Sequence, residues 1–487
     1  MNTPLLELDF QQHFHSLPPQ FYSRVQAQGL DSPDIVVTSP SCAAILNIDT
    51  DSLNSPETLA VLSGNSPLPN TQSLAMKYTG HQFGYYNPEL GDGRGLLLAE
   101  VQTRTNGLWD LHLKGAGRTP FSRQGDGRAV LRSSIREFLG SEAMAALGIP
   151  TSRALCVLNS KTPVYRETKE TGANLLRVTQ THIRFGHFEF AYHSGDHSLL
   201  KALCDYTIKR HYPCMAGSIQ QYANFFKITA KKTAHLIAKW QAFGFAHGVM
   251  NTDNMSILGE TFDYGPFGFL DKFQPGYICN HSDTSGRYAF DRQPAIAHWN
   301  LSVLAQALSP LIEEEDLKTG FQQFNETFND AYITLMRSKF GLLKAYDQDE
   351  VFIHHSLNML AKNQLDYCFF FREISQINNQ EVQQTLKDLC VDTPAFEAWL
   401  AQYLKRLELE SSTVTERKKQ MNQVNPKYIL RNHLAQQAIE LAEKGDYSEV
   451  QQLHNLLQKP FEEQPGMEHY AALPPDWAEG LEISCSS

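Results

Sequence analysis

Long hydrophobic runs are missing from this 487-residue chain. No segment approaches the roughly 18 uninterrupted apolar residues that mark a membrane-spanning helix. With 42% hydrophobic and 20% charged residues, the composition is that of an ordinary globular protein. The first twenty residues have no basic segment followed by an apolar one, and they are neither rich in arginine nor poor in acids, so they do not resemble a targeting peptide. We therefore expect a soluble protein of the bacterial cytoplasm with no membrane partner.

Net positive charge and paired cysteines are also absent. The formal charge of -11 argues against a surface that follows nucleic-acid phosphates, so no nucleic-acid partner is expected. The eight cysteines include no C-x-x-C pair and no Cys/His spacing typical of zinc, which is the pattern of reduced cytosolic thiols. Cys485 is the third residue from the end of the sequence, where we expect an exposed thiol. An inert tail cysteine and a redox-active one both stay open.

No internal repeat is visible, and the length allows about two to four domain-sized units. The hydrophobic patterning predicts an α+β protein. We expect four parts: an irregular N-terminal extension at 1–75, a part at 76–215 with several strands and one amphipathic helix ending near Gly148, a helical part at 216–330, and a helical C-terminal extension at 331–487. The stretch from 459 onward, rich in Pro and Glu, is expected to be a partly extended tail.

A catalytic-loop motif follows a long helical pattern and reads HGVMNTDNMSILGETFDYG at 247–265. It matches the protein-kinase loop H-R-D-L-x-x-x-N and the later D-F-G at His247, Asn254, Asp263 and Gly265. Val249 stands where a kinase has its base. The amide oxygen of Asn254 and the carboxylate of Asp263 are predicted to share one Mg²⁺ or Mn²⁺ ion.

Asp253 lies beside Asn254 on the same loop. It either points into the site as an acid, a base or a coordinating group, or it caps a turn, and the sequence leaves both open.

Elements that position phosphates in kinases occur earlier in the chain, in the expected order. GDGRG at 91–95 could by itself be a hairpin turn, but Lys114 follows at the end of a predicted strand and Glu137 lies on the next helix. Kinases have the same order of elements: a glycine loop, then a lysine on a strand, then a glutamate on a helix. Small residues flank Glu137 on its helix face, where another strand could approach closely: Ser133, Ser134, Gly140 and Ser141. Together these parts predict a kinase-like bilobal fold.

Further basic and histidine residues surround these motifs. The arginine stripe is predicted to be a solvated face and comprises Arg118, Arg123, Arg128, Arg132 and Arg136. Arg177 and Arg184 suit phosphate oxygens, although they could equally pair with carboxylates. Four irregularly spaced histidines favour a polar loop over a metal site: His182, His187, His193 and His197.

Five segments taken together resemble the selenoprotein O family of pseudokinases: GDGRG, LHLKGAGRTPFSRQGDGRAVLRSSIREFLGSEAM, LLRVTQTHIRFGHFE, HGVMNTDNMSILGETFDYGPFGFLD and the final Cys-Ser-Ser. The likeness covers nearly the whole chain. It implies a protein adenylyltransferase that binds ATP turned around relative to a kinase, so that AMP passes to a Ser, Thr or Tyr hydroxyl of a protein and pyrophosphate leaves. Transfer of an α-phosphate does not require adenine, so UMP transfer from UTP is also compatible.

The resemblance assigns roles to individual positions. It implies nucleotide contacts at Gly91, Gly93, Arg94, Lys114, Asp126, Gly127, Arg177, Arg184 and Asp263. It makes Asp253 the proton acceptor, Asn254 and Asp263 the metal ligands, and Glu137 the partner of Lys114.

Cys485 stands where eukaryotic members carry selenocysteine, which favours a redox role. We hypothesise that Cys279 is its disulfide partner. An atypical kinase acting through Asp253 and an inactive pseudokinase that binds ATP as a scaffold remain alternatives.

Overall fold

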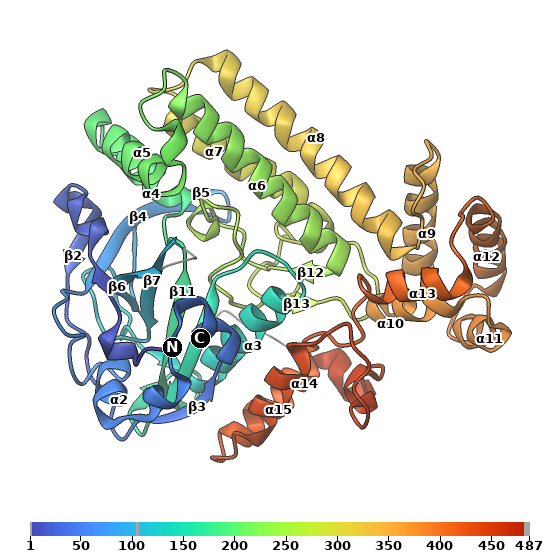
Figure 1. Ribbon diagram of the computed structural model, residues 1–487, viewed down its shortest axis with the longest axis horizontal. Helices are drawn as coiled ribbons and strands as arrows, with labels where there is room; N and C mark the ends of the chain where they lie inside the picture. The colour runs from blue at the N-terminus through green and yellow to red at the C-terminus, as the bar shows by residue number, and fades with distance from the viewer. Residues whose placement is uncertain (1, 104–106, 482–487) are drawn as a thin grey trace.

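The computed structural model describes residues 2–103 and 107–481, and it confirms an α+β architecture. An antiparallel sheet forms one side of the molecule, and long helices form the other (Figure 1). No helix in the described ranges is long and apolar enough to cross a membrane.

Seven strands form the main path of the sheet, in the order β2 (Tyr22–Arg24), β4 (Leu74–Gln82), β6 (Gly95–Thr103), β7 (Gly107–Lys114), β11 (Lys169–Thr179), β9 (Arg153–Asn159) and β3 (Asp34–Thr38). Four more strands lie off this path: β1 (Phe10–Gln11) pairs with β6, β5 (Tyr85–Gly91) with β4, and both β8 (Ala129–Val130) and β10 (Pro163–Tyr165) with β11. In the register of β7 and β11, Lys114 lies opposite Leu175 and His112 opposite Arg177. The lysine and the arginine therefore lie on neighbouring strands near one end of the sheet.

The N-terminal region differs from the expectation of an irregular extension. Its strands β1, β2 and β3 belong to the main sheet, and it contains the helices α1 (Pro40–Leu46) and α2 (Pro56–Leu62). Short strands need a partner edge to be stable, and that edge comes from residues far along the chain. Composition alone therefore could not reveal them.

Helix α3 (Leu131–Ala146) crosses behind the sheet, and the predicted helix is confirmed. The chain leaves it through Gly148, whose φ of +73° favours glycine. The expectation of a solvated arginine face is wrong for Arg136. Its guanidinium lies 4.8 Å from the Phe267 ring and donates to the Phe267 carbonyl at 2.8 Å. The C-terminal helices α14 (Asn432–Ala442) and α15 (Ser448–Leu457) pack on α3 and leave it little exposed face.

The helical side begins with α4 (Phe185–His193) and α5 (His197–His211). The expectation that four histidines share a polar loop is wrong, because His187 and His193 lie in α4 and His197 begins α5, and only His182 lies in the segment before α4. His182 and His187 are buried, and His187 caps the start of α4 through its Nδ1. Burial of this kind follows from packing against the sheet, which spacing in the sequence does not report.

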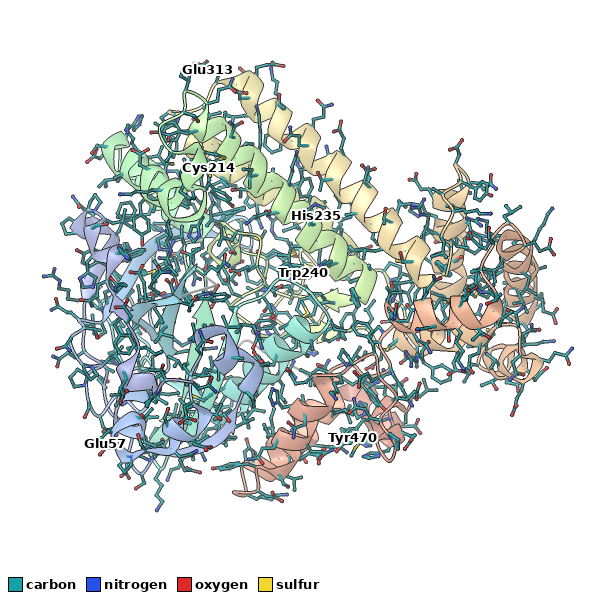
Figure 2. The ribbon with its side chains drawn as sticks, viewed as in Figure 1. Glu57, Cys214, His235, Trp240, Glu313 and Tyr470 are labelled. Carbon is teal, nitrogen blue, oxygen red and sulfur yellow. The ribbon has the colours of Figure 1, made fainter. Side chains whose placement is uncertain are left out.

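Long helices α6 (Gln221–Phe243) and α8 (Glu314–Lys339) run side by side, with α7 (Gln293–Leu308) against both (Figure 1). The remaining helices extend to the far end of the molecule: α9 (Asp349–Asn363), α10 (Tyr367–Glu373), α11 (Gln380–Asp388), α12 (Thr393–Leu407) and α13 (Val414–Asn422). The region beyond residue 331 is thus mostly helical, as expected. Trp240 on α6 lies inside the body of the molecule, and Tyr470 beyond α15 is also buried (Figure 2).

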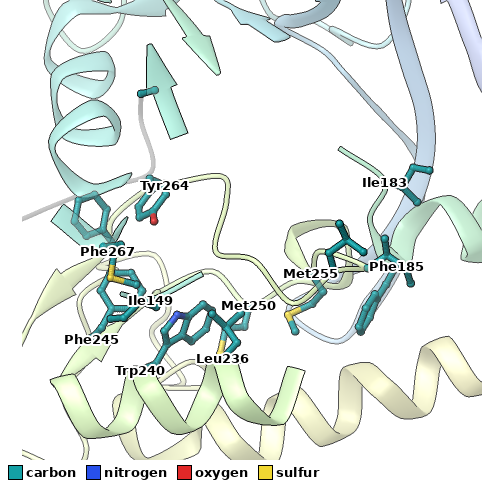
Figure 3. Packing of buried hydrophobic residues seen from close by; sticks show 14 of the residues in the cluster. Ile149, Ile183, Phe185, Leu236, Trp240, Phe245, Met250, Met255, Tyr264 and Phe267 are labelled. Carbon is teal, nitrogen blue, oxygen red and sulfur yellow. The ribbon is translucent and has the colours of Figure 1, made fainter. Parts of the chain in front are cut away.

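Buried aromatic residues pack at the two ends of the catalytic-loop motif. Helix α6 ends at Phe243 and is capped by Gly244, and the short strands β12 (Phe245–Ala246) and β13 (Gly268–Phe269) then pair on either side of the motif. Trp240, Phe245, Tyr264 and Phe267 pack together there (Figure 3), with the Tyr264 and Phe267 rings 5.2 Å apart. The loop between these strands is therefore anchored at both ends, which fixes its polar residues.

Candidate active site

A cavity of about 500 Å³ lies where the glycine loop, β7, β11 and the catalytic-loop motif meet. This is within the usual size range of small-molecule sites. It is lined by every residue predicted to contact nucleotide or metal or to act as the acid/base: Gly91, Gly93, Arg94, Lys114, Asp126, Gly127, Arg177, Arg184, Asp253, Asn254 and Asp263. Val249 lines it too. The structure therefore brings together residues that are more than 170 positions apart.

The glycine loop connects β5 to β6, and its conformation is held by Asp92. The Asp92 carboxylate accepts hydrogen bonds from the Met76 backbone at 3.0 Å and from His112 Nε2 at 3.2 Å. The chain passes so close to Phe121 that a Cβ at Gly91 would lie 2.5 Å from its ring. The loop backbone is thus fixed before any ligand arrives, which suits a phosphate cradle.

Glu137 lies behind the cavity and holds two of its cations. Its carboxylate accepts from Lys114 Nζ and from Arg177 Nε and Nη2, the latter two at 2.5 and 3.1 Å. Burial alone would favour the neutral acid, but Arg177 and Lys114 lower the pKa of Glu137 to about 2. Burial also lowers the pKa of Lys114 to about 8, with Glu137 opposing this effect. The predicted pairing of Lys114 with Glu137 is present, and Arg177 shares it.

Asp263 faces the same cations from the catalytic-loop side. Arg177 Nη1 lies 2.7 Å from its Oδ1, and Arg184 Nη1 donates to its Oδ2. Burial by itself would raise the pKa of Asp263, but Arg184 and Arg177 hold it well below its usual range. Asp263 has a φ of +58° and lines the cavity. An ionised carboxylate therefore lies near three cations, Arg184, Arg177 and Lys114.

Asp253 has a different environment from Asp263, although both line the cavity. Gln82 Nε2 donates to its Oδ2 at 3.2 Å, while Oδ1 is buried and has no hydrogen-bond partner among the described residues. Burial raises the pKa of Asp253 to about 7; Arg184 lowers it and Asp263 adds to the rise. Two carboxyl groups with pKa values pushed apart are typical of a site in which one holds charge and the other exchanges a proton.

The residues predicted to bind metal have suitable donor atoms. Asn254 Nδ2 donates to the Val249 carbonyl at 3.0 Å, so the amide oxygen is the atom that can face a cation. The Asp263 side chain is 23% exposed and ionised. Among the described residues no group of three or more His, Cys, Asp or Glu side chains could hold a metal ion. An ion bound by Asn254 and Asp263 would thus complete its shell with phosphate oxygens and water, as Mg²⁺ usually does.

Three contributors were missed by the sequence reasoning: Gln82, Asp92 and Arg166. Arg166 forms a bidentate ion pair with Asp126, in which Nη1 donates to Oδ2 at 2.8 Å and Nη2 donates to Oδ1 at 3.0 Å. Asp92 sits inside GDGRG and had a local signal in that motif. Gln82 and Arg166 had none, because each meets its partner only through contacts between segments that are distant in sequence.

Of the two cysteines in the disulfide hypothesis, the structure describes only Cys279. Cys279 is buried beneath the start of the catalytic loop, where a Cβ at Gly248 would lie 2.6 Å from its Sγ. It does not line the nucleotide-sized cavity. Cys485 lies outside the described residues, so their pairing stays a prediction.

Comparison with known proteins identifies the family of the chain. Residues 4–458 match the family model described as Protein adenylyltransferase SelO. Proteins named Protein nucleotidyltransferase YdiU are similar along 99% of both chains: 51% identity over 484 residues in Azotobacter vinelandii, 53% over 487 in Vibrio parahaemolyticus and 51% over 480 in Aliivibrio salmonicida. These matches confirm the resemblance to selenoprotein O. The chain belongs to the family of protein adenylyltransferase SelO.

Proposed function

We propose that this chain is a protein adenylyltransferase that moves AMP from ATP to Ser, Thr or Tyr hydroxyls of other proteins. Its scaffold would be a kinase-like bilobal fold, with a small lobe at 76–215, a large lobe at 216–330, and extensions at 1–75 and 331–487. UTP would serve as a second nucleotide donor, because the cations that line the cavity bind phosphate groups and do not distinguish one nucleobase from another.

The observation that carries this proposal is the placement of Asp253. It lines the same cavity as Lys114, Arg177 and Arg184, while Val249 occupies the position of a kinase base. A carboxyl group with a pKa of about 7 is suited to accept a proton near neutral pH. This placement supports a reaction in which Asp253, four residues beyond the kinase base position, accepts the proton while the cations of the same cavity bind phosphate.

In the proposed reaction the acceptor hydroxyl oxygen attacks the α-phosphorus of ATP. The new oxygen–phosphorus bond forms as the bond from the α-phosphorus to the bridging oxygen breaks, and pyrophosphate leaves with that electron pair. Asp253 takes the hydroxyl proton, and Gln82 orients its carboxyl group. Arg177 and Arg184 stabilise the charge on the phosphates. A Mg²⁺ or Mn²⁺ ion held by Asn254 and Asp263 would supply further neutralisation of the polyphosphate.

Intact mass spectrometry after incubation with ATP and Mg²⁺ or Mn²⁺ tests the proposal. We expect an added AMP on the chain itself or on a protein acceptor, no increment after chelation of the metal, and none for Asp263→Ala. An added phosphate would instead indicate a kinase, and nucleotide binding without any increment would indicate a scaffold. Labelling that persists in Asp263→Ala would refute the assignment of the metal site.

A further inference from the structure

The tip of the β4–β5 hairpin is fastened to the catalytic loop. Gln82 donates to the Asp253 carboxylate at 3.2 Å, and the Phe83 backbone N–H donates to Tyr288 Oη at 2.9 Å and to Asn251 Oδ1 at 3.3 Å. The Phe83 and Tyr288 rings lie 5.1 Å apart. The residues that follow Gln82 are thus held in a fixed place directly beside the proposed proton acceptor.

A second cavity, of about 550 Å³, opens on the outer side of this tip. Phe83 and Tyr85 form one wall, and Tyr85 is 81% exposed while Phe83 is 36% exposed. Residues 282–285, Arg287, Arg292 and Ile296 form the rest. Two exposed aromatic rings at one hollow are typical of a surface that binds another molecule.

The cavity wall carries two guanidinium groups, of Arg287 and Arg292, against one carboxylate, of Asp283, so its charge is net positive. Neither Arg287 nor Arg292 forms an ion pair with a described residue. The Arg287 guanidinium instead lies 4.6 Å from the Trp299 ring. Asp283 is in the same wall, but its carboxylate accepts from the backbone N–H groups of Arg287 and Tyr288 at 2.9 and 2.6 Å. A negatively charged partner would therefore complement this wall, although the whole chain has a formal charge of -11.

We propose that this second cavity docks the polypeptide that carries the acceptor hydroxyl. It selects acceptors that have Asp or Glu near the hydroxyl residue, for Arg287 and Arg292, and an apolar side chain for the Phe83 and Tyr85 rings. This inference rests on the proposed function, because it places the acceptor beside Asp253. A chain that enters over the hairpin tip reaches the nucleotide cavity from the side of Gln82, which lines that cavity directly before Phe83.

Peptide kinetics test this selection. Three synthetic peptides would share one central serine and one leucine and differ only in their flanking residues, which would be Glu, Gln or Lys. With the wild type we expect the Glu peptide to have a KM about 10-fold below that of the Gln peptide, and the Lys peptide to be the poorest acceptor. The advantage of the Glu peptide should shrink as salt rises, because exposed charges are screened.

Two variants and a matched control separate docking from chemistry. Arg292→Gln should raise the KM of the Glu peptide 3- to 10-fold, with kcat and the KM of the Gln peptide unchanged. Tyr85→Ala should raise the KM of all three peptides. Lys419→Gln removes one exposed cation from the distant helix α13 and should leave kcat and the KM of each peptide unchanged. The proposal is overturned if Arg292→Gln discriminates among the peptides as the wild type does.

Binding without turnover keeps the docking proposal distinct from the proposed function. If no peptide gains AMP, fluorescence polarisation of the labelled peptides in the presence of ATP measures docking directly. A preference for the Glu peptide that disappears in Arg292→Gln would support the docking surface even though the transfer reaction had failed. Equal binding of the Glu and Gln peptides by the wild type would overturn it.

Discussion

Replacing Glu137 with glutamine should weaken both the fold and the nucleotide site. The Glu137 side chain is 1% exposed, and its carboxylate accepts from both Lys114 and Arg177. Glutamine keeps the shape but removes the charge, and its amide N–H groups would face a cation where the carboxylate accepted. Removing one partner of a buried ion pair typically costs about 3–5 kcal/mol. We expect that loss in the free energy of unfolding.

The two cations should then lose their common anchor. Lys114 and Arg177 both line the cavity and would repel each other without the carboxylate between them. We expect ATP affinity to fall by at least about tenfold, which corresponds to about 1.4 kcal/mol.

Glu142→Gln is the matched control, because Glu142 is on the same helix and is also 1% exposed. It pairs with Arg153, through Nε at 2.8 Å and Nη2 at 2.6 Å, and it lies outside the cavity. This variant should lose comparable stability and bind ATP as the wild type does.

Urea unfolding followed by circular dichroism would measure stability, and titration with a fluorescent ATP analogue at low temperature would measure affinity while both variants are folded. Equal ATP affinities for Glu137→Gln and Glu142→Gln would refute the idea that Glu137 acts by positioning the two cations.

Three further variants probe backbone strain and buried charge. Gly127 (φ +72°) and Gly148 (φ +73°) share a left-handed conformation, but a Cβ at Gly127 would lie 2.2 Å from the Gly117 carbonyl group, whereas one at Gly148 meets nothing within 4 Å. Alanine should therefore cost about 1–2 kcal/mol at Gly148, and clearly more, with weaker ATP binding, at Gly127; equal losses in urea unfolding would contradict this reading. Burial raises the pKa of Glu260 from its ordinary 4.5 to about 7, so its stabilising contribution is present below pH 4.5 and is lost as pH rises through 7. Glu260→Gln retains an acceptor for Thr179. The free energy of unfolding of the wild type should fall by up to about 3 kcal/mol more than that of Glu260→Gln between pH 5 and pH 8. Parallel pH profiles of the free energy of unfolding for the two proteins would show that Glu260 is not responsible.

Much of the candidate site could be predicted because its chemistry is concentrated in short segments. GDGRG, the strand that ends in Lys114, the helix that carries Glu137 and the loop from His247 to Gly265 are each local in sequence. Periodicity predicted the strands and helices that carry them, and α3, α6, β6 and β7 have nearly the expected bounds.

The failures share a physical cause, which is burial by distant segments. Arg136 looked solvated because its own helix gives no sign that Phe267 and the C-terminal helices cover it. The strands β2 and β3 looked irregular because each is only a few residues long and depends on pairing with β4 and β9.

The sequence by itself determined which residue types are available for the chemistry and their order along the chain. That order includes the loss of a kinase base at Val249 and the retention of Asn254 and Asp263. Only the tertiary structure decided the state of each group. Two aspartates ten positions apart have opposite pKa shifts, because Asp263 meets two guanidinium groups while Asp253 is buried against Gln82 from the β4 strand. Desolvation and ion pairing depend on neighbours in space, and those neighbours come from segments that the local sequence does not specify.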